Sequence, residues 1–242
     1  MNPYPLTFKT LGASALLIEW PNKIDRSILH DILLLQSRIE NELKGSLIET
    51  VNAYNSLTII FKSKIASFNE IKGSIQQLHS VPSSRKSLTP RVWKIPVCYD
   101  KEFGIDLEEV ARQHKLSSDE IIRIHSQADY TIYFTGFLPG FLYLGGLPER
   151  IHTTRKSTPR LRIKKGAVAI GGQQTGIYPS ESPGGWNIIG NCPLSFFDPN
   201  HNPPCFAQAG DSLQFYSVNK KAHQQIESEV ATGKFNIESE LL

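Results

Sequence analysis

The 242-residue sequence contains little cysteine: Cys98, Cys192 and Cys205 lie far apart and form no C-x-x-C pair. Proteins of oxidising compartments usually pair their cysteines, so we interpret these three as free thiols of a cytoplasmic protein. The N-terminus lacks the basic and apolar runs of a signal peptide. No apolar run approaches the ~18 residues that a membrane span requires. We therefore expect a cytoplasmic protein that does not contact a membrane.

An excess of charge of one sign is also missing, since 26 basic residues face 23 acidic ones. Two short helices are predicted after Asp106 and Ser117, because Glu109 and Glu120 follow three residues later and complete capping boxes. Such a helix pair is typical of DNA-binding proteins. The segment 106–123 holds five acidic and three basic side chains, however, and a net acidic helix is repelled by phosphates. We expect no nucleic-acid partner.

Several standard catalytic motifs are absent. The sequence has no G-x-x-x-x-G-K-[ST] phosphate loop, no G-x-G-x-x-G after a strand, no H-E-x-x-H and no G-x-S-x-G. These absences argue against a nucleotide-binding P-loop, a dinucleotide fold, a zinc-protease site and a nucleophile elbow. The seven histidines show no metal-ligand spacing, and no metal site is expected.

The first 80 residues predict a small α+β domain in the order β-α-β-β-α. The expected elements are a strand at 15–20, a helix at 24–43, strands within 46–61 and a helix at 68–78. Residues 81–90 are rich in proline and serine, so we interpret them as a linker. A second domain would span 91–219, followed by a polar C-terminal tail at 220–242 with one short helix. In the second domain we expect strands at 91–97, 130–134, 167–170 and 213–218, and another near 196–197.

The segment 136–190 differs from the rest of the chain in glycine content and in charge. It contains 11 of the 17 glycines, and its short apolar runs alternate with turn signals. This pattern is typical of a β-barrel or sandwich. The segment carries seven basic and two acidic side chains, a net +5, while the remainder of the chain is −2. Arginines and glycine-loop N–H groups bind anions, so an anionic small molecule is a candidate ligand, although a solvated basic surface fits the charge equally well.

Individual residues leave two interpretations open at this point. His125, at the end of the second predicted helix, is a candidate acid or base or simply caps the helix. Tyr143 and Trp186 lie within or beside glycine-rich turns and line a pocket or pack the core. Gln173 and Thr175 lie between glycines and contact a ligand or merely form the turn.

Four spaced motifs stand in the second domain. They are GFLPGFLYLGGLP at 136–148, GGQQTGIYP at 171–179, SPGGW at 182–186 and FDP at 197–199. Together they resemble the KipI / PxpB family, also called allophanate hydrolase subunit 1. The likeness runs from about residue 95 to residue 217 and, more loosely, over the first domain.

The resemblance implies an α+β N-terminal domain followed by a mainly-β, cyclophilin-like barrel. It also implies a subunit of an ATP-dependent 5-oxoprolinase, a complex that hydrolyses 5-oxo-L-proline to L-glutamate, with this subunit inactive alone. ATP with Mg would then act at the level of the complex, whose partners are a PxpC/KipA-like subunit and a LamB/YcsF-like PxpA subunit. The alternatives are a KipI-type inhibitor of a sensor histidine kinase and a subunit that processes urea or allophanate.

The family's motif residues can be carried over position by position. We expect Arg160 to bind an anion, and His125 to transfer a proton. The expected substrate contacts are Phe141, Tyr143, Gln173, Thr175, Tyr178, Ser182 and Trp186, and the expected loop glycines are Gly140, Gly176, Gly184 and Gly185.

Overall fold

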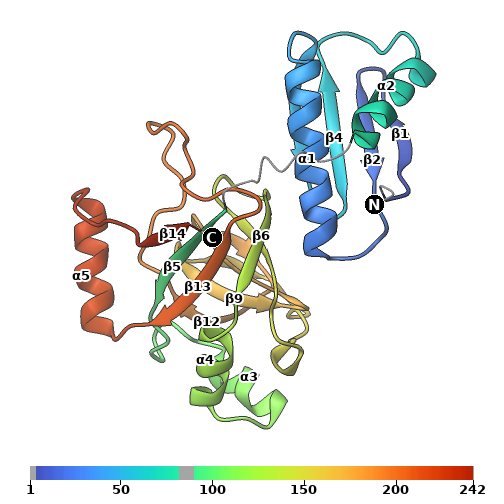
Figure 1. Ribbon diagram of the computed structural model, residues 1–242. Helices are drawn as coiled ribbons and strands as arrows, with labels where there is room; N and C mark the ends of the chain where they lie inside the picture. Colours follow the sequence, from blue (N-terminus) through green and yellow to red (C-terminus); the bar gives the residue numbers. More distant parts are fainter. Residues whose placement is uncertain (1–3, 82–89, 242) are drawn as a thin grey trace. The chain divides into compact units, whose positions relative to one another are not determined.

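The computed structural model describes residues 4–81 and 90–241. By its internal contacts the chain divides into two compact units, Met1–Leu88 and Thr89–Leu242, which are described separately (Figure 1). The proline- and serine-rich linker predicted at 81–90 falls almost entirely outside the described residues. None of the helices formed by the described residues combines the length and apolar composition that a bilayer crossing requires.

The first unit is a four-stranded antiparallel sheet with two helices on one face (Figure 1). Its strands, β1 (Thr7–Leu11), β2 (Ala15–Glu19), β3 (Leu47–Asn52) and β4 (Ser56–Phe61), are arranged in the order β1-β2-β4-β3. Helix α1 (Arg26–Glu42) buries a stripe of leucines and isoleucines at helical spacing, and α2 (Phe68–Ser80) packs beside it. The predicted order lacked β1, a mostly exposed edge strand without the apolar alternation that reveals β4.

The second unit contains three hydrogen-bonded sheets. The largest has the order β14-β5-β13-β6-β7, formed by Ser239–Leu241, Arg91–Val97, Ser212–Ser217, Tyr130–Thr135 and Leu142–Gly145. The second has the order β10-β9-β12, formed by Gln174–Ile177, Ala167–Gly171 and Asn187–Asn191. The third pairs β11 (Ser182–Gly184) with β8 (Arg160–Ile163). A 3-10 turn, η1, spans Glu149–Ile151.

The described strands do not close into one barrel, so this part of the predicted fold class is corrected. Outside the three sheets, the described residues form only isolated bridges, Cys98 to Asn191 and Thr153 to Gly172. A register shift between Ile188 and Gly190 also bends β12. Bulges and glycine turns interrupt the ladders that a closed barrel would need. The coarser prediction, a mixture of helices and several sheets with a mainly-β second unit, is confirmed.

Three helices accompany these sheets: α3 (Leu107–His114), α4 (Ser118–Ser126) and α5 (Lys220–Ala231). The capping box predicted at Ser117 is present, with Ser117 and Glu120 exchanging hydrogen bonds. Asp106 is the N-cap of α3 but makes no side-chain cap bond. Its carboxylate is used elsewhere, as described below.

Two expectations for the end of the chain are wrong. The segment after residue 219 is not a loose polar tail, because β14 pairs with β5 and Phe235 and Ile237 pack against the main core. No strand forms at Phe196–Phe197, where the backbone runs as an irregular loop. Phe196 is fully buried nonetheless, so its apolar character reflects packing instead of strand pairing.

Candidate functional site

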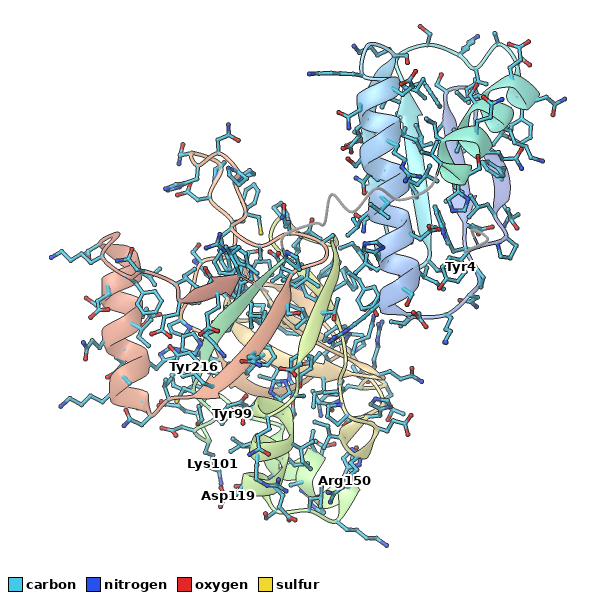
Figure 2. The ribbon with its side chains drawn as sticks, in the orientation of Figure 1. Tyr4, Tyr99, Lys101, Asp119, Arg150 and Tyr216 are labelled. Carbon is cyan, nitrogen blue, oxygen red and sulfur yellow. The ribbon has the colours of Figure 1, made fainter. Side chains whose placement is uncertain are left out.

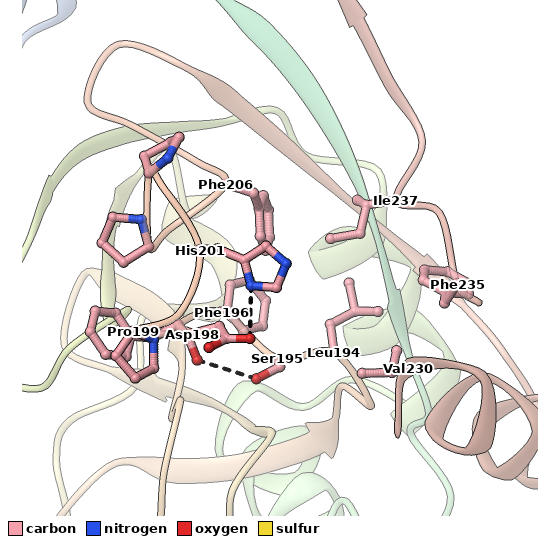
Figure 3. A pocket seen from close by; sticks show the side chains of 13 residues that line it. Leu194, Ser195, Phe196, Asp198, Pro199, His201, Phe206, Val230, Phe235 and Ile237 are labelled. Atoms are coloured by element: carbon pink, nitrogen blue, oxygen red, sulfur yellow. Dashed lines mark hydrogen bonds and ion pairs between the residues drawn. The ribbon is translucent and has the colours of Figure 1, made fainter. Parts of the chain in front are cut away.

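Three cavities of ligand size open on the second unit. One of about 360 Å³ lies between the loop 194–206 and the C-terminal segment, and its exposed ion pair joins His201 Nδ1 to Asp198 Oδ2 at 2.8 Å (Figure 3). A second, of about 290 Å³, is lined by residues that include Tyr99, Lys101 and Asp119, all labelled in Figure 2. The third, also about 360 Å³, collects residues of the motifs singled out in the sequence. We call it the aromatic pocket.

The aromatic pocket is formed by segments that are distant in the sequence. Its lining residues are Phe137, Phe141, Tyr143, Arg155, Lys156, Pro159, Tyr178, Pro183, Gly184, Gly185 and Trp186. They come from the start of β7, the loop before β8, the end of β10 and the segment from β11 to β12. Six predicted residues are therefore brought together: Phe141, Tyr143, Tyr178, Gly184, Gly185 and Trp186.

Phe141 is the centre of the aromatic wall. Its ring centroid lies 5.0 Å from that of Tyr143, 5.6 Å from that of Tyr178 and 5.8 Å from that of Trp186. The Tyr178 and Trp186 rings meet it nearly edge to face, at 86° and 78°. Such contacts fix the rings in one arrangement. The result is a rigid apolar surface that fits a flat organic ring.

Glycines let these rings approach the backbone. A Cβ on Gly184 would overlap the Tyr178 hydroxyl, and a Cβ on Gly171 would overlap the Trp186 ring. Gly176 faces both Phe141 and Trp186, where a Cβ would lie 3.3 Å from each ring. The glycine-rich motifs therefore shape the aromatic wall, and no substitution with a Cβ fits at Gly171 or Gly184 without displacing a ring.

The cations at the aromatic pocket differ in their availability. Lys156 Nζ lies 3.0 Å from Glu109 Oε2 and 3.1 Å from Asp106 Oδ1, so acids neutralise it. Burial lowers the pKa of Lys156, but these two partners outweigh that effect and raise it, which keeps the ammonium charged. The exposed Arg155 guanidinium stands 5.6 Å from the Trp186 ring centroid and donates to Gln174 Oε1 at 3.3 Å. No ion pair to Arg155 is seen among the described residues.

Burial raises the pKa of the Tyr178 hydroxyl, although the positive charge of Arg155 and a backbone hydrogen bond from Trp186 act against the shift. Tyr178 is therefore a neutral phenol at neutral pH, able to donate a hydrogen bond. Together, Arg155 and Tyr178 offer a charge and a polar hydrogen on an otherwise apolar wall.

The predicted anion-binding Arg160 is committed to a structural ion pair. Its two terminal nitrogens donate to Asp106 Oδ2 at 2.9 Å and Oδ1 at 2.6 Å, the bidentate geometry that guanidinium prefers. Asp106 is buried and also accepts from the backbone N–H of Ile188 at 2.8 Å. Burial alone would raise the pKa of Asp106, but the hydrogen bonds from Arg160, Ile188 and Lys156 lower it overall. Arg160 does not line the aromatic pocket.

The predicted proton-transfer residue, His125, lies in the core with no exposed surface. Its Nδ1 is 2.8 Å from the Tyr99 hydroxyl and its Nε2 is 2.9 Å from Thr175 Oγ1, which itself donates to Ala169 O. Since the Thr175 proton is used on Ala169, Nε2 carries the proton and Nδ1 accepts from Tyr99. Burial lowers the pKa of His125 to about 3, so the ring is neutral. This geometry supports a structural role and no proton transfer.

The remaining predicted residues lie outside the aromatic pocket. Gln173 is exposed on the turn between β9 and β10, whereas Thr175 is buried against His125. Ser182 is buried, and its hydroxyl has no partner among the described residues. Gly140 and Gly176 support the aromatic wall from behind without lining the cavity.

Sequence reasoning missed Arg155, Lys156 and Phe137 as lining residues. Arg155 and Lys156 had been counted in the basic segment, but nothing local distinguished them from the other cations. Phe137 lies inside the first glycine-rich motif, and its neighbours Phe141 and Tyr143 were chosen instead.

Residues 6–207 match the family described as carboxyltransferase domain, subdomain C and D. The chain is 36% identical over 229 residues to a PxpB-type 5-oxoprolinase subunit of Bacillus subtilis, covering 90% of this chain and 95% of that protein. The chain therefore belongs to the PxpB family of 5-oxoprolinase subunits, which confirms the resemblance seen in the glycine-rich motifs.

Solved structures share the fold. The crystal structure of TTHA0988 is 30% identical with a TM-score of 0.73 and covers 85% of this chain, which spans only 39% of that protein. Urea amidolyase of K. lactis has a TM-score of 0.82 at 20% identity and covers 99% of this chain, which spans 16% of that protein. At that identity the likeness is one of fold alone.

Proposed function

We propose that this chain is one component of an ATP-dependent 5-oxoprolinase complex, which hydrolyses 5-oxo-L-proline to L-glutamate, and that it is inactive alone. Membership of the PxpB family of 5-oxoprolinase subunits supports this assignment. A subunit implies partners, and we propose a PxpC/KipA-like protein and a LamB/YcsF-like PxpA protein in that role. The complex would act in the cytoplasm.

The aromatic pocket is the observation that carries the proposal. 5-Oxoproline is a flat five-membered lactam that bears one carboxylate. The rings of Phe141, Tyr178 and Trp186 provide an apolar wall for the lactam, and Arg155 provides a cation for the carboxylate. Arg155 thus takes the anion-binding role that the sequence assigned to Arg160.

The chemistry explains why ATP is needed. A lactam carbonyl is a poor electrophile at neutral pH, and transfer of the γ-phosphoryl group to its oxygen makes the carbon reactive toward water. Water then adds, the ring nitrogen leaves as the amine, and glutamate, ADP and phosphate result. The sequence has no phosphate loop, so we assign ATP and its Mg to the complex and substrate positioning to this chain. Tyr178 is placed to donate to the substrate.

The test is ATP-dependent glutamate release from 5-oxo-L-proline by this chain alone and with both partners. We expect activity only in the mixture, with a raised KM for Arg155→Ala. Arg160→Ala, the matched arginine control, should lose stability instead. An assembled complex that releases no glutamate would sink the proposal for this substrate; the same complex would then be assayed with urea and allophanate.

A second candidate function is inhibition of a sensor histidine kinase, as proposed for KipI-type proteins. Leu161, 88% exposed on β8, favours it because so exposed a leucine suits protein docking. Inhibition of kinase autophosphorylation that is lost in Leu161→Asp, while glutamate release persists, would show that the two functions are separate.

A further inference from the structure

The loop 136–141 at the rim of the aromatic pocket contains a strained residue. Phe137 has φ +62°, a left-handed conformation that residues with a Cβ rarely adopt. The N–H of Leu138 donates to the carbonyl of Gly136 at 2.6 Å, which closes a tight turn around Phe137. A positive φ within a three-residue turn is the rare and strained type of γ-turn. Strain of this kind is usually stored where function needs it.

Packing of the Phe137 side chain does not explain this strain. The residue is 62% exposed, and its ring forms an edge-to-face pair with Phe141 at 5.6 Å and 88°. A ring retained only for stability would be buried, because burial is what stabilises an aromatic side chain. The turn therefore holds an aromatic ring in solvent at the mouth of the pocket.

The rest of the loop is built to maintain this position. Gly136 N–H donates to Phe141 O at 3.1 Å, and Phe141 N–H donates to Leu138 O at 2.9 Å. Gly140 also has a positive φ, +81°, and a Cβ there would lie 2.9 Å from Phe197 Cβ. These bonds and close contacts fix the loop, so the ring of Phe137 is preorganised at the rim.

We propose that Phe137 is a specificity-determining residue that caps a planar, carboxylate-bearing ring bound in the aromatic pocket. The ligand lies against the wall of Phe141 and Trp186 with its carboxylate at Arg155, and Phe137 covers its outer face. Binding buries the exposed ring, and this burial compensates for the backbone strain. The identity of the ligand as a lactam rests on the proposed function, whereas the strained cap rests on the structure alone.

The test combines stability with kinetics in Phe137→Gly and Phe137→Ala. Glycine normally destabilises a protein relative to alanine, but at a strained positive φ the order reverses. We expect the urea midpoint of Phe137→Gly to lie above that of Phe137→Ala. In the assembled complex, both variants should raise KM for 5-oxo-L-proline about five- to tenfold, the value of one aromatic contact, with little change in kcat. Ile48→Ala, equally exposed at 62% on β3, is the control and should leave KM unchanged.

Each outcome decides the proposal. A higher midpoint for Phe137→Ala than for Phe137→Gly would show that the turn is unstrained, and an unchanged KM would show that the ring does not touch substrate. Loss of complex assembly in gel filtration would make Phe137 a contact between subunits instead of a cap. If the wild-type complex does not act on 5-oxo-L-proline, the proposed function fails and the order of the two midpoints alone decides whether the strained cap stands.

Discussion

Asp106→Asn removes one negative charge from the centre of the second unit and should destabilise it markedly. The carboxylate accepts two hydrogen bonds from Arg160, one from the backbone N–H of Ile188 and an ion pair from Lys156. An asparagine oxygen replaces some of these acceptors, but its NH2 group faces donors that it cannot satisfy.

The magnitude follows from the burial of the partners. Breaking a fully buried ion pair costs about 3–5 kcal/mol. The side chains of Arg160 and Lys156 retain 30% and 20% exposure, so water replaces part of what they lose. We therefore expect a loss of about 2–3 kcal/mol, which lowers Tm by roughly 5–10 °C for a unit of this size. Thermal unfolding at neutral pH measures this loss.

The pH dependence supplies an independent check on the same carboxylate. The pKa of Asp106 is lower in the folded protein than its ordinary value of 3.8. Its contribution is therefore fully present above the unfolded value and is lost as the pH falls through the folded one. The Tm gap between wild type and Asp106→Asn should be constant near neutrality and close below about pH 4. The exposed Asp198→Asn is the control. A Tm change below about 2 °C, or a gap that persists in acid, would refute the reasoning.

Three further predictions concern the aromatic pocket and the core. Arg155→Ala should raise KM for 5-oxo-L-proline at least tenfold without lowering Tm, because the charge contacts ligand and pairs with no acid among the described residues; equal losses of stability and affinity would contradict this. The His125 ring should show no NMR titration between about pH 5 and 8, since burial lowers its pKa to about 3, and stability should fall as the pH drops below about 6.5 by about 1.4 kcal/mol per pH unit; a titration midpoint near 6.5 would place the ring in solvent. Gly184→Ala should lower Tm and weaken ligand binding together, because its Cβ overlaps the Tyr178 hydroxyl; an unchanged Tm would show that the aromatic wall yields.

Local signals in the sequence predicted the local structure. Apolar spacing located α1, and the Ser117 capping box located the start of α4. The glycine-rich motifs predicted the aromatic wall, because glycine is required wherever a ring meets the backbone. The weak edge strand β1 and the C-terminal strand β14 had no such signal. Pairing of β14 with β5 joins residues about 150 positions apart, which local periodicity does not report.

The roles of the arginines could not be predicted in the same way, because they depend on a partner far along the chain. Arg155 and Arg160 lie in one basic segment with similar surroundings in sequence. Asp106, 54 residues before Arg160, decides between them by taking both guanidinium nitrogens of Arg160. The same competition explains why Asp106 begins α3 without capping it.

This division of labour predicts how the two arginines couple to Asp106. Combining Asp106→Asn with Arg160→Ala should cost less than the sum of the two single changes, because the second change removes an interaction already lost. Arg155→Ala should add to Asp106→Asn independently, since Arg155 bonds to Gln174 and faces Trp186. Double-mutant cycles of unfolding free energy measure both couplings. A coupling of Arg155 as large as that of Arg160 would mean that the two cations form one site, and Arg155 would then not be free to bind the carboxylate of a substrate.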